Sequence, residues 1–352
     1  MSNVSPDDGT IKINFCAFSE RFMDVRTRLP YEFIAKMHDI DLVYSKNEIR
    51  IGNLTGFNGP KIVIAQRPRI DDSQKWLKAL SKLRNNDCLF IYEIDDHLDL
   101  VDKINKKDVG TKILLKSAMA VQTSTKPLAD EFSLYNENVR WFDNSCHNIS
   151  FFRKENDVPQ IFFGALNRDT YSKEIASLIS DVVIKYGAFV HVVSDRNFYD
   201  GIKSQNKTYY HHLNYDDYIN VMRKCDILIS PLRGLLGEKF KSDIKYIEAS
   251  SHGLATIASE LVYSRTIEDG KTGILVKDEI EWPEKLERLL VSPEYRRKLG
   301  YNAWDYVRRE RMFAQQAPLR INWYLDLWSR RNELWGMALN RVPELREFEH
   351  TR

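Results

Sequence analysis

The chain has 352 residues, of which 43% are hydrophobic and 12% aromatic, so it can form two globular domains and is not intrinsically disordered. Its 52 basic and 50 acidic residues leave a net charge of only +2, which excludes the basic excess that nucleic-acid-binding proteins usually show. The four cysteines form no C-x-x-C pair and suit a reducing compartment. No apolar run reaches the membrane-spanning length of about 18 residues, and no signal peptide is expected.

Short apolar runs recur along the chain after residues 1–10, which are polar and expected to be disordered. The runs lie at residues 11–18, 40–45, 61–66, 88–94, 118–124 and 139–144, and then at 160–166, 188–194, 208–213, 225–232, 254–259 and 273–277. Continuous apolar runs of this kind predict strands that are buried on both faces of a parallel sheet.

Amphipathic stretches separate many of these runs, and four of them are expected to be helices. They lie at residues 72–84, 172–186, 215–224 and 283–299. Alternation of strand and helix predicts right-handed crossovers and a doubly wound α/β sheet. Two sets of about six strands predict two Rossmann-like domains in tandem, at residues 11–150 and 151–305, with a helical extension at 306–352.

Ligands of open α/β sheets bind outside the carboxyl ends of the strands, so the residues that follow each run carry most functional weight. Asp95, Asp96 and His97 follow the run that ends at residue 94. Arg168 follows Gly164, and Arg233 follows the run that ends near residue 230.

The stretch "KSDIKYIEASSHGLATIAS" (241–259) predicts a helix that begins at Ser242 and leads into a buried strand. A helix N-terminus attracts anions, and Lys241 and Lys245 add positive charge beside it. Glu248 lies one turn further on and can accept hydrogen bonds from a diol. Together these groups suit a nucleoside diphosphate, with its phosphates at the helix tip and its ribose at Glu248. The alternative is a solvated charged face with i,i+3 pairing.

The segments "CDILISPL", "KSDIKYIEASSHGLATIAS" and "TIEDGKTGILV" resemble the C-terminal half of family-4 (group 1) glycosyltransferases, which have the GT-B fold. The segments "VIAQRP", "FIYEIDDHL", "AMAVQTSTKPLADEF" and "NVRWFDN" resemble the N-terminal half of a subgroup of these enzymes. The resemblance covers most of residues 11–310. It implies two Rossmann-like domains and C-terminal helices that cross back to the N-terminal domain.

The resemblance implies specific roles for several residues. Glu248 matches the second glutamate of the E-x7-E motif, which holds the donor ribose, whereas Phe240 stands where the first glutamate is expected and Glu238 is offset by two positions. The donor-binding residues are expected to be Gly164, Arg168, Arg233, Lys241, Ser242, Lys245 and Glu248, and the catalytic residues Asp95, Asp96, His97, Lys241 and Lys245. Arg168 and Lys173 only approximately match the family's basic pair.

Three features of the N-terminal half and the tail leave alternatives open. Asp95 and Asp96 can hold a metal ion, but no third ligand is suitably spaced, so we favour a role in positioning acceptor or sugar; His97 is either a base or structural. Arg26 and Arg28, in the glycine-free loop after the first strand, suit either ligand contacts or a helix surface. The aromatic tail suits either an interfacial membrane helix or helices packed on the N-terminal domain.

The sequence therefore predicts a cytoplasmic glycosyltransferase with at most a peripheral association with the inner face of the membrane. It would move a sugar from a UDP- or GDP-linked donor to a glycan, lipid-linked or other acceptor, with retention of configuration and without a metal or other cofactor. Polysaccharide biosynthesis is the expected setting, and no nucleic-acid partner is expected. The alternatives are a nucleotide-sugar epimerase and a non-catalytic GT-B module that binds a glycan or a partner, which Phe240 favours.

Overall fold

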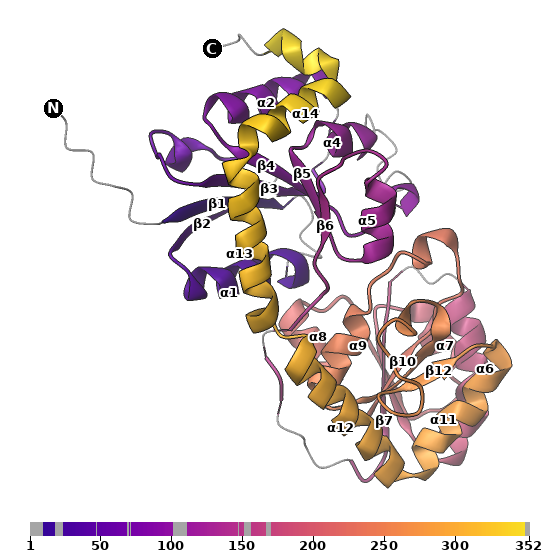
Figure 1. Ribbon diagram of the computed structural model, residues 1–352. Helices are drawn as coiled ribbons and strands as arrows, with labels where there is room; N and C mark the ends of the chain where they lie inside the picture. Colours follow the sequence, from indigo (N-terminus) through magenta and orange to yellow (C-terminus); the bar gives the residue numbers. More distant parts are fainter. Residues whose placement is uncertain are drawn as a thin grey trace. The chain divides into compact units, whose positions relative to one another are not determined.

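The computed structural model describes residues 10–17, 24–46, 48–68, 70, 72–100, 111–146, 148–150, 156–166 and 170–348 of the chain. The chain divides into two compact units (Figure 1). The first comprises Met1–Asp143 and Phe313–Arg352, and the second comprises Asn144–Met312. The boundaries that the sequence predicts, at residues 150 and 305, lie a few residues from these divisions. The expected disorder of the N-terminus concerns residues that lie almost entirely outside the described ranges.

The first unit is built on a six-stranded parallel sheet with the strand order β2-β1-β3-β4-β5-β6. Its strands are β1 (Ile11–Ala17), β2 (Ile40–Lys46), β3 (Lys61–Gln66), β4 (Leu89–Glu93), β5 (Ala120–Thr123) and β6 (Val139–Trp141). Every described side chain of β3, β4 and β5 is buried, as the continuous apolar runs predict for central parallel strands.

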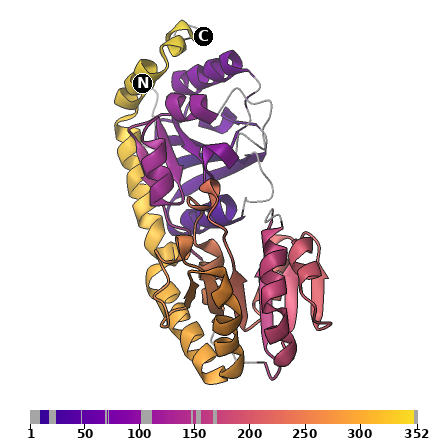
Figure 2. The same cartoon turned by 90° about the vertical axis from the view of Figure 1, so that its right-hand side faces the viewer.

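Helices of the first unit come from both ends of the chain. The N-terminal part contributes a π-helical turn at Asp24–Arg28, α1 (Leu29–Met37), a 3-10 turn at Gly52–Leu54, α2 (Ser73–Asn85), α4 (Thr111–Ser117) and α5 (Lys126–Phe132). The C-terminal part contributes α13 (Phe313–Ser329), α14 (Arg331–Arg341) and a 3-10 segment at Pro343–Phe348. Figure 2 shows these yellow helices running beside the indigo and purple elements of the unit, and α13 contacts α1 and β3. The helices that the resemblance implies therefore complete this unit.

The second unit has another six-stranded parallel sheet, with the order β12-β11-β10-β7-β8-β9. Its strands are β7 (Gln160–Gly164), β8 (Phe189–Val193), β9 (Lys207–Tyr210), β10 (Ile227–Ser230), β11 (Ala255–Ser259) and β12 (Ile274–Val276). Its helices are α6 (Tyr171–Lys185), α7 (Arg196–Gly201), α8 (Tyr215–Met222), α9 (Ile244–Ser251), α10 (Glu260–Tyr263), α11 (Trp282–Val291) and α12 (Pro293–Glu310), with 3-10 turns at Leu236–Glu238 and Glu279–Glu281.

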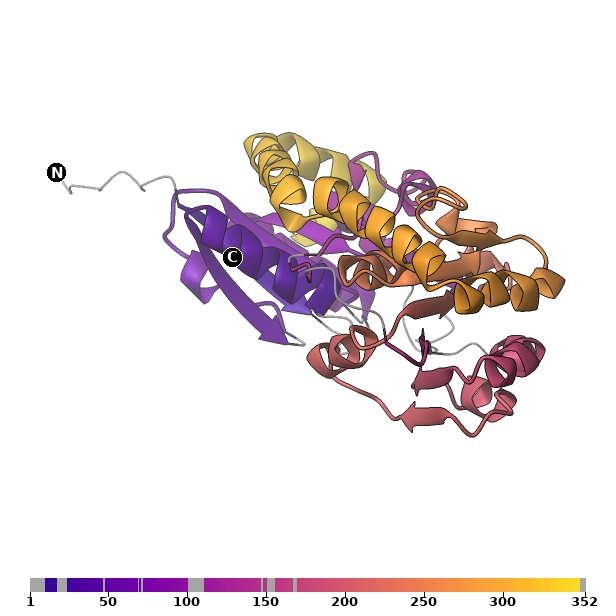
Figure 3. The ribbon, with the colours of Figure 1, turned by 90° about the horizontal axis from the view of Figure 1, so that it is seen from below.

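Alternate residues of the central strand β7 pack into different apolar clusters of the second unit. Ile161 and Phe163 of β7 pack in the cluster that includes α6 and α11, whereas Phe162 packs in the cluster that includes residues of α8 and α9. Figure 3 shows this unit from below, with helices on both sides of its strands. The doubly wound α/β architecture that the sequence predicts is thus confirmed in both units.

Two predicted helices differ from the structure. The stretch expected as one helix at residues 283–299 is two helices, because Ser292 lies between them and its hydroxyl accepts from the N–H of Tyr295, while Pro293 has no N–H to continue the first helix. The helix expected to begin at Ser242 begins at Ile244, and its N-cap residue is Asp243.

None of the helices that the structure describes combines the length and the hydropathy that crossing a lipid bilayer requires.

Candidate functional site

Three neighbouring strands of the second unit, β7, β10 and β11, end beside the N-terminal half of α9. The Nζ of Lys245 donates to the backbone oxygen of Gly164, the last residue of β7. Gly164 is required here, since a Cβ at this position would lie 2.8 Å from the ring of Tyr218 and 2.9 Å from that of Phe162. The structure therefore brings together Gly164 and Lys245, two of the residues that the sequence predicts for a donor site.

The residues just before α9 are held by side chains and do not cap the helix. The Nδ2 of Asn144 donates to the hydroxyl of Ser242 at 2.7 Å. Asp243 accepts from both terminal nitrogens of Arg311, at 2.7 and 2.9 Å, and from the hydroxyl of Thr266 at 2.6 Å. No side chain caps α9, so the prediction that Ser242 caps the helix is wrong: its oxygen is bonded to Asn144.

The two lysines lie in different local structures. Lys241 precedes the helix, and its backbone N–H donates to the oxygen of Glu238 at 3.1 Å, whereas Lys245 is the second residue of α9. Both side chains are half-buried. Lys241 thus lies just before α9 and Lys245 in its first turn, so both are beside the start of the helix.

Glu248 lies on the inner face of α9 and is 5% exposed. Burial raises the pKa of its carboxyl group to about 7, while a hydrogen bond from Tyr215 and the positive charge of Lys245 act in the opposite direction. Tyr215 is the first residue of α8, which Asn214 caps through its side chain. The site thus holds a carboxyl group that changes charge near neutral pH, between a phenol and an ammonium group.

Arg233 lies on the loop after β10, and its exposed guanidinium group lies 5.7 Å from the ring centroid of Tyr171. The backbone of this loop is fixed at Leu232, whose N–H donates to the hydroxyl of Ser259 at 2.8 Å. Phe240 is half-buried and offers no carboxylate. Glu238 is 8% exposed and its carboxylate points to the backbone of the loop at residues 233–235.

In the first unit, Asp95 and Asp96 follow β4 and share one cation. The Nη2 of Arg67 lies 2.5 Å from Asp95 and 2.6 Å from Asp96. Arg67 directly follows β3 and has a φ of +46°, an uncommon left-handed conformation for a non-glycine residue. No group of three or more potential metal-binding side chains occurs among the described residues. The two carboxylates therefore have an arginine between them, a partner that the sequence does not indicate.

His97 is 6% exposed and its Nδ1 accepts from the backbone N–H of Asp99 at 3.3 Å. Its Nε2 lies 3.9 Å from the carboxylate of Glu131 on α5. The imidazole ring is thus oriented by groups on both sides, which is compatible with either of the roles that the sequence leaves open for it.

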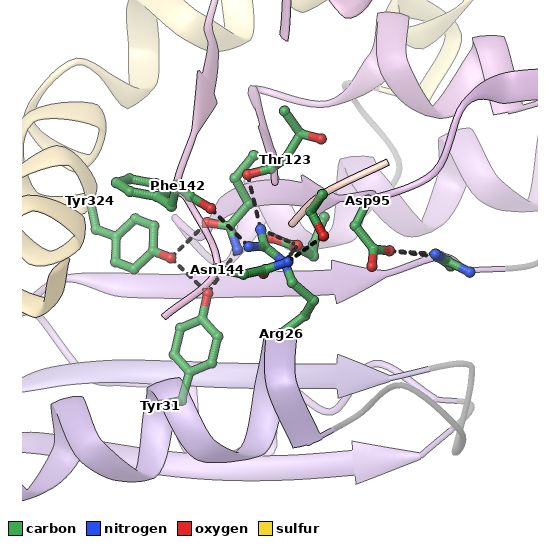
Figure 4. Close-up of polar contacts among 11 residues, drawn as sticks. Arg26, Tyr31, Asp95, Thr123, Phe142, Asn144 and Tyr324 are labelled. Atoms are coloured by element: carbon green, nitrogen blue, oxygen red, sulfur yellow. Dashed lines mark hydrogen bonds and ion pairs between the residues drawn. The ribbon is translucent and has the colours of Figure 1, made fainter. Parts of the chain in front are cut away.

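Arg26 is buried in the first unit, where it forms an ion pair with Glu93 (Figure 4). Its Nε donates to the carboxylate of Glu93 at 2.8 Å, and its terminal nitrogens donate to the backbone oxygens of Thr123 and Phe142, each at 2.9 Å. The sequence suggests a ligand contact or a helix surface for Arg26, and the surface alternative is wrong because only 2% of the residue is exposed. Arg28, in contrast, pairs with nearby acidic side chains at the surface.

A closed ring of hydrogen bonds joins α13 to the rest of the first unit. The hydroxyls of Tyr31 and Tyr324 lie 2.6 Å apart; Tyr324 donates to the Oε1 of Gln122 at 2.6 Å, and the Nε2 of Gln122 donates to Tyr31 at 2.8 Å. Figure 4 shows the two tyrosines meeting beside the Arg26 cluster. The aromatic residue Tyr324 of the tail is thus part of the core, which favours the helix-packing alternative over an interfacial membrane helix.

The sequence of the second unit matches a known protein family. Residues 160–292 match the family model described as "Glycosyl transferases group 1". These residues make up most of the second unit, so the second unit carries a group 1 glycosyltransferase domain. With this domain the chain is a glycosyltransferase of the EC 2.4 class, and the matched residues include β7, β10 and all of α9.

Solved structures support the GT-B fold of this glycosyltransferase. Sucrose-phosphate synthase from Thermosynechococcus elongatus is 15% identical, with a TM-score of 0.62, over 91% of this chain and 99% of its own. HepE from Anabaena is 10% identical, with a TM-score of 0.60, over 89% and 98%. TarM from S. aureus is 14% identical, with a TM-score of 0.52, over 75% of this chain and 55% of its own, so the chain spans about half of TarM. No curated protein matches the sequence significantly.

Two residues that contact the predicted site residues of the glycosyltransferase have weak sequence signals. Tyr215 follows β9 and Arg67 follows β3, so both obey the rule that strand ends carry function, but neither residue type is diagnostic by itself. Arg168, predicted to bind the donor, lies outside the described residues. Lys173, its expected partner, is exposed on the first turn of α6.

The raised pKa of Glu248 predicts a pH dependence of folding stability. Its pKa is about 7 in the folded glycosyltransferase and 4.5 ordinarily, so its contribution to stability is complete below about pH 4.5 and is lost as the pH rises through about 7. We expect the free energy of unfolding of Glu248→Gln, relative to that of the wild type, to increase as the pH rises through this interval. Urea unfolding at a series of pH values measures the difference, and parallel curves for the two proteins would contradict it.

Proposed function

We propose that this glycosyltransferase moves a sugar from a UDP-linked donor to a glycan or lipid-linked acceptor, with retention of configuration. The observation that carries the proposal is the junction between β7 and α9, where Lys245 is held at Gly164 and Glu248 is buried one turn away. An ammonium group suits a diphosphate, and a carboxylate suits the vicinal hydroxyls of a ribose.

The solved structures support the choice of uridine nucleotide. HepE has been crystallised with UDP and glucose and with UDP-glucose, and the TarM complex and the pneumococcal O-GlcNAc transferase GtfA also contain UDP. We extend this donor class to the present chain because its second unit matches the family and carries the residues described above. Arg233 and Lys241 are the further cations that we place at the donor phosphates.

The chemical step would be stabilised mainly by electrostatics. As the bond between sugar and diphosphate breaks, negative charge grows on the leaving oxygen. A cation that is already fixed beside a helix N-terminus stabilises this charge without reorganisation. Lys245 meets this requirement, since its ammonium group is hydrogen-bonded to a strand end before any donor binds.

The first unit would bind the acceptor. We place Asp95, Asp96 and His97 at the acceptor or at the transferred sugar, as the strand-end position of these residues suggests. The shared contact with Arg67 would fix the two carboxylates, so that they act as oriented hydrogen-bond acceptors for hydroxyl groups.

Calorimetry with UDP, GDP, ADP and CMP, followed by incubation with radiolabelled UDP-sugars, tests the proposal. We expect UDP to bind most tightly, and label to pass from the donor to an acceptor. A changed nucleotide sugar in the absence of an acceptor would instead indicate an epimerase. UDP binding without transfer, hydrolysis or epimerisation would favour a non-catalytic module, for which Phe240 is the specific observation.

Transfer is expected to persist in EDTA. Asp95 and Asp96 already share the guanidinium group of Arg67, which supplies the positive charge that a metal ion would bring. Initial rates measured with EDTA, and again after addition of excess Mg²⁺ or Mn²⁺, check the prediction. A complete loss of activity that either ion restores would assign these carboxylates to a metal instead.

The proposed ribose contact adds a functional consequence to the titration of Glu248. An ionised carboxylate accepts hydrogen bonds from hydroxyl groups more strongly than a neutral one. We therefore expect UDP affinity to rise as the pH passes through about 7, the pKa of Glu248. Because phosphate groups titrate near pH 6, Glu248→Gln serves as the control. Identical pH profiles for the two proteins would remove Glu248 from the ribose site.

A further inference from the structure

Glu238 makes an unusual set of contacts beside the proposed donor site. One oxygen of its carboxylate, Oε2, accepts three successive backbone N–H groups: from Arg233 at 2.8 Å, from Gly234 at 2.9 Å and from Leu235 at 3.3 Å. Successive N–H groups that converge in this way form an anion-binding concavity. Here a carboxylate of the chain itself occupies it.

The loop adopts a backbone conformation that lets these N–H groups converge. Gly234 has a φ of +96°, which only glycine adopts readily, and a Cβ there would meet nothing within 4 Å, so conformation and not space requires the glycine. Glu238 ends the 3-10 turn at Leu236–Glu238 and is 8% exposed. Burial of a carboxylate is costly unless hydrogen bonds offset it, and the three N–H groups do so.

The braced loop carries Arg233, whose backbone N–H is one of the three donors. On the other side of this residue, Leu232 is fixed by the hydroxyl of Ser259 at 2.8 Å and by the hydroxyl of Tyr171 at 3.5 Å. The guanidinium group of Arg233 also lies over the ring of Tyr171, at 5.7 Å from its centroid. The backbone at Arg233 is therefore held from two sides while its charged group stays exposed.

We infer that Glu238 is a positioning residue for donor binding: it fixes the loop at residues 233–235 and thereby holds the guanidinium group of Arg233 at the donor phosphates. The inference rests on the proposed function. It gives Glu238 the task of holding the loop rather than a ligand, because its Oε2 accepts from the backbone. Glu238 acts through Arg233 and does not touch the donor.

A double-mutant cycle with UDP as the probe tests this role. We expect Glu238→Ala and Arg233→Ala each to weaken UDP binding about tenfold, the scale of one charged hydrogen bond. The double variant should bind UDP no more weakly than Arg233→Ala alone. Glu238→Gln keeps an acceptor oxygen in the same shape and should lose less affinity. KM for the UDP-sugar should rise more than kcat falls, as expected for a lost ground-state contact.

Asp226→Ala is the matched control. Asp226 is also buried and also accepts backbone N–H groups, from Gln160 at 2.7 Å and from Asn156 at 3.3 Å, but it precedes β10 and so lies at the opposite end of this strand from the loop at residues 233–235. We expect this variant to lower the melting temperature without changing UDP affinity. Amide hydrogen exchange at residues 233–235, measured without nucleotide, should accelerate in Glu238→Ala and stay unchanged in Asp226→Ala.

Three results would overturn the inference. The first is wild-type UDP affinity in folded Glu238→Ala. The second is an additive loss in the double variant, which would mean that Glu238 acts independently of Arg233. The third is unchanged exchange at residues 233–235. A wild-type protein that binds no UDP would instead overturn the proposed donor class, and the inference with it, so the two failures are distinguishable.

Discussion

Lys245→Ala is expected to lower kcat/KM for sugar transfer by at least about tenfold, since removal of one preorganised electrostatic contact often costs about 2 kcal/mol or more. The ammonium group of Lys245 is already hydrogen-bonded to Gly164 at the end of β7, so it meets the leaving diphosphate without reorganisation. Because negative charge grows in the transition state, kcat should fall as well as KM rise.

Substitutions of other kinds separate the charge of Lys245 from its packing. Lys245→Arg keeps the charge and should be milder, although not neutral, because a planar guanidinium group meets phosphate differently. Lys185→Ala, at an exposed lysine of α6 that pairs with Glu287, serves as the surface control and should leave the kinetics unchanged. Wild-type kinetics in both Lys245→Ala and Lys241→Ala would mean that these lysines do not contact the donor and have no role in catalysis.

Lys245 also affects the titration of Glu248. Its positive charge lowers the pKa of that carboxyl group, which burial holds at about 7. In Lys245→Ala the pKa of Glu248 should therefore rise further, and the pH at which UDP binding reaches half its maximum should move upward. This shift is a readout that a loss of diphosphate binding alone would not produce.

The architecture could be predicted from the sequence because buried parallel strands have continuous apolar sequences. The run at residues 61–66 is β3, and every one of its side chains is buried. The sequence points to Glu248 through its spacing from Lys245 and its match to the second glutamate of the E-x7-E motif. Its depth and its contact with Tyr215 could not be predicted, since Tyr215 lies on another helix, 33 positions earlier in the chain.

Other errors have the same origin, a partner that is distant in sequence. Ser242 has the residue type and position of a helix cap, but Asn144 binds its hydroxyl, and Arg311 binds the neighbouring Asp243. The sequence indicates no partner for the carboxylates of Asp95 and Asp96, yet Arg67 lies between them. Local patterns predict elements, whereas the partners of polar groups depend on which strand ends the topology makes neighbours.

Removal of one member of the buried ion pair in the first unit should destabilise that unit by about 3–5 kcal/mol, the range for an uncompensated buried charge. Arg26→Met would leave the buried carboxylate of Glu93 without its ion-pair partner, with the charge of Arg320 still acting on it, and the backbone oxygens of Thr123 and Phe142 would each lose a donor. Burial already raises the pKa of Glu93, and loss of Arg26, which opposes that shift, should raise it further.

Replacing both partners tests whether this loss comes from an unpaired charge. The double variant Arg26→Met with Glu93→Leu removes both charges, so it should be more stable than Arg26→Met alone. Lys126→Met is the control in the same unit, because Lys126 and Asp130 form an exposed pair that should contribute about 1 kcal/mol or less. Urea unfolding followed by tryptophan fluorescence and by hydrogen exchange in β4 and β5 measures the effects unit by unit. If Arg26→Met were no more destabilising than Lys126→Met, the ion pair would contribute little to stability. The contacts of Arg26 with three strand ends would then have to be explained by ligand binding rather than by folding.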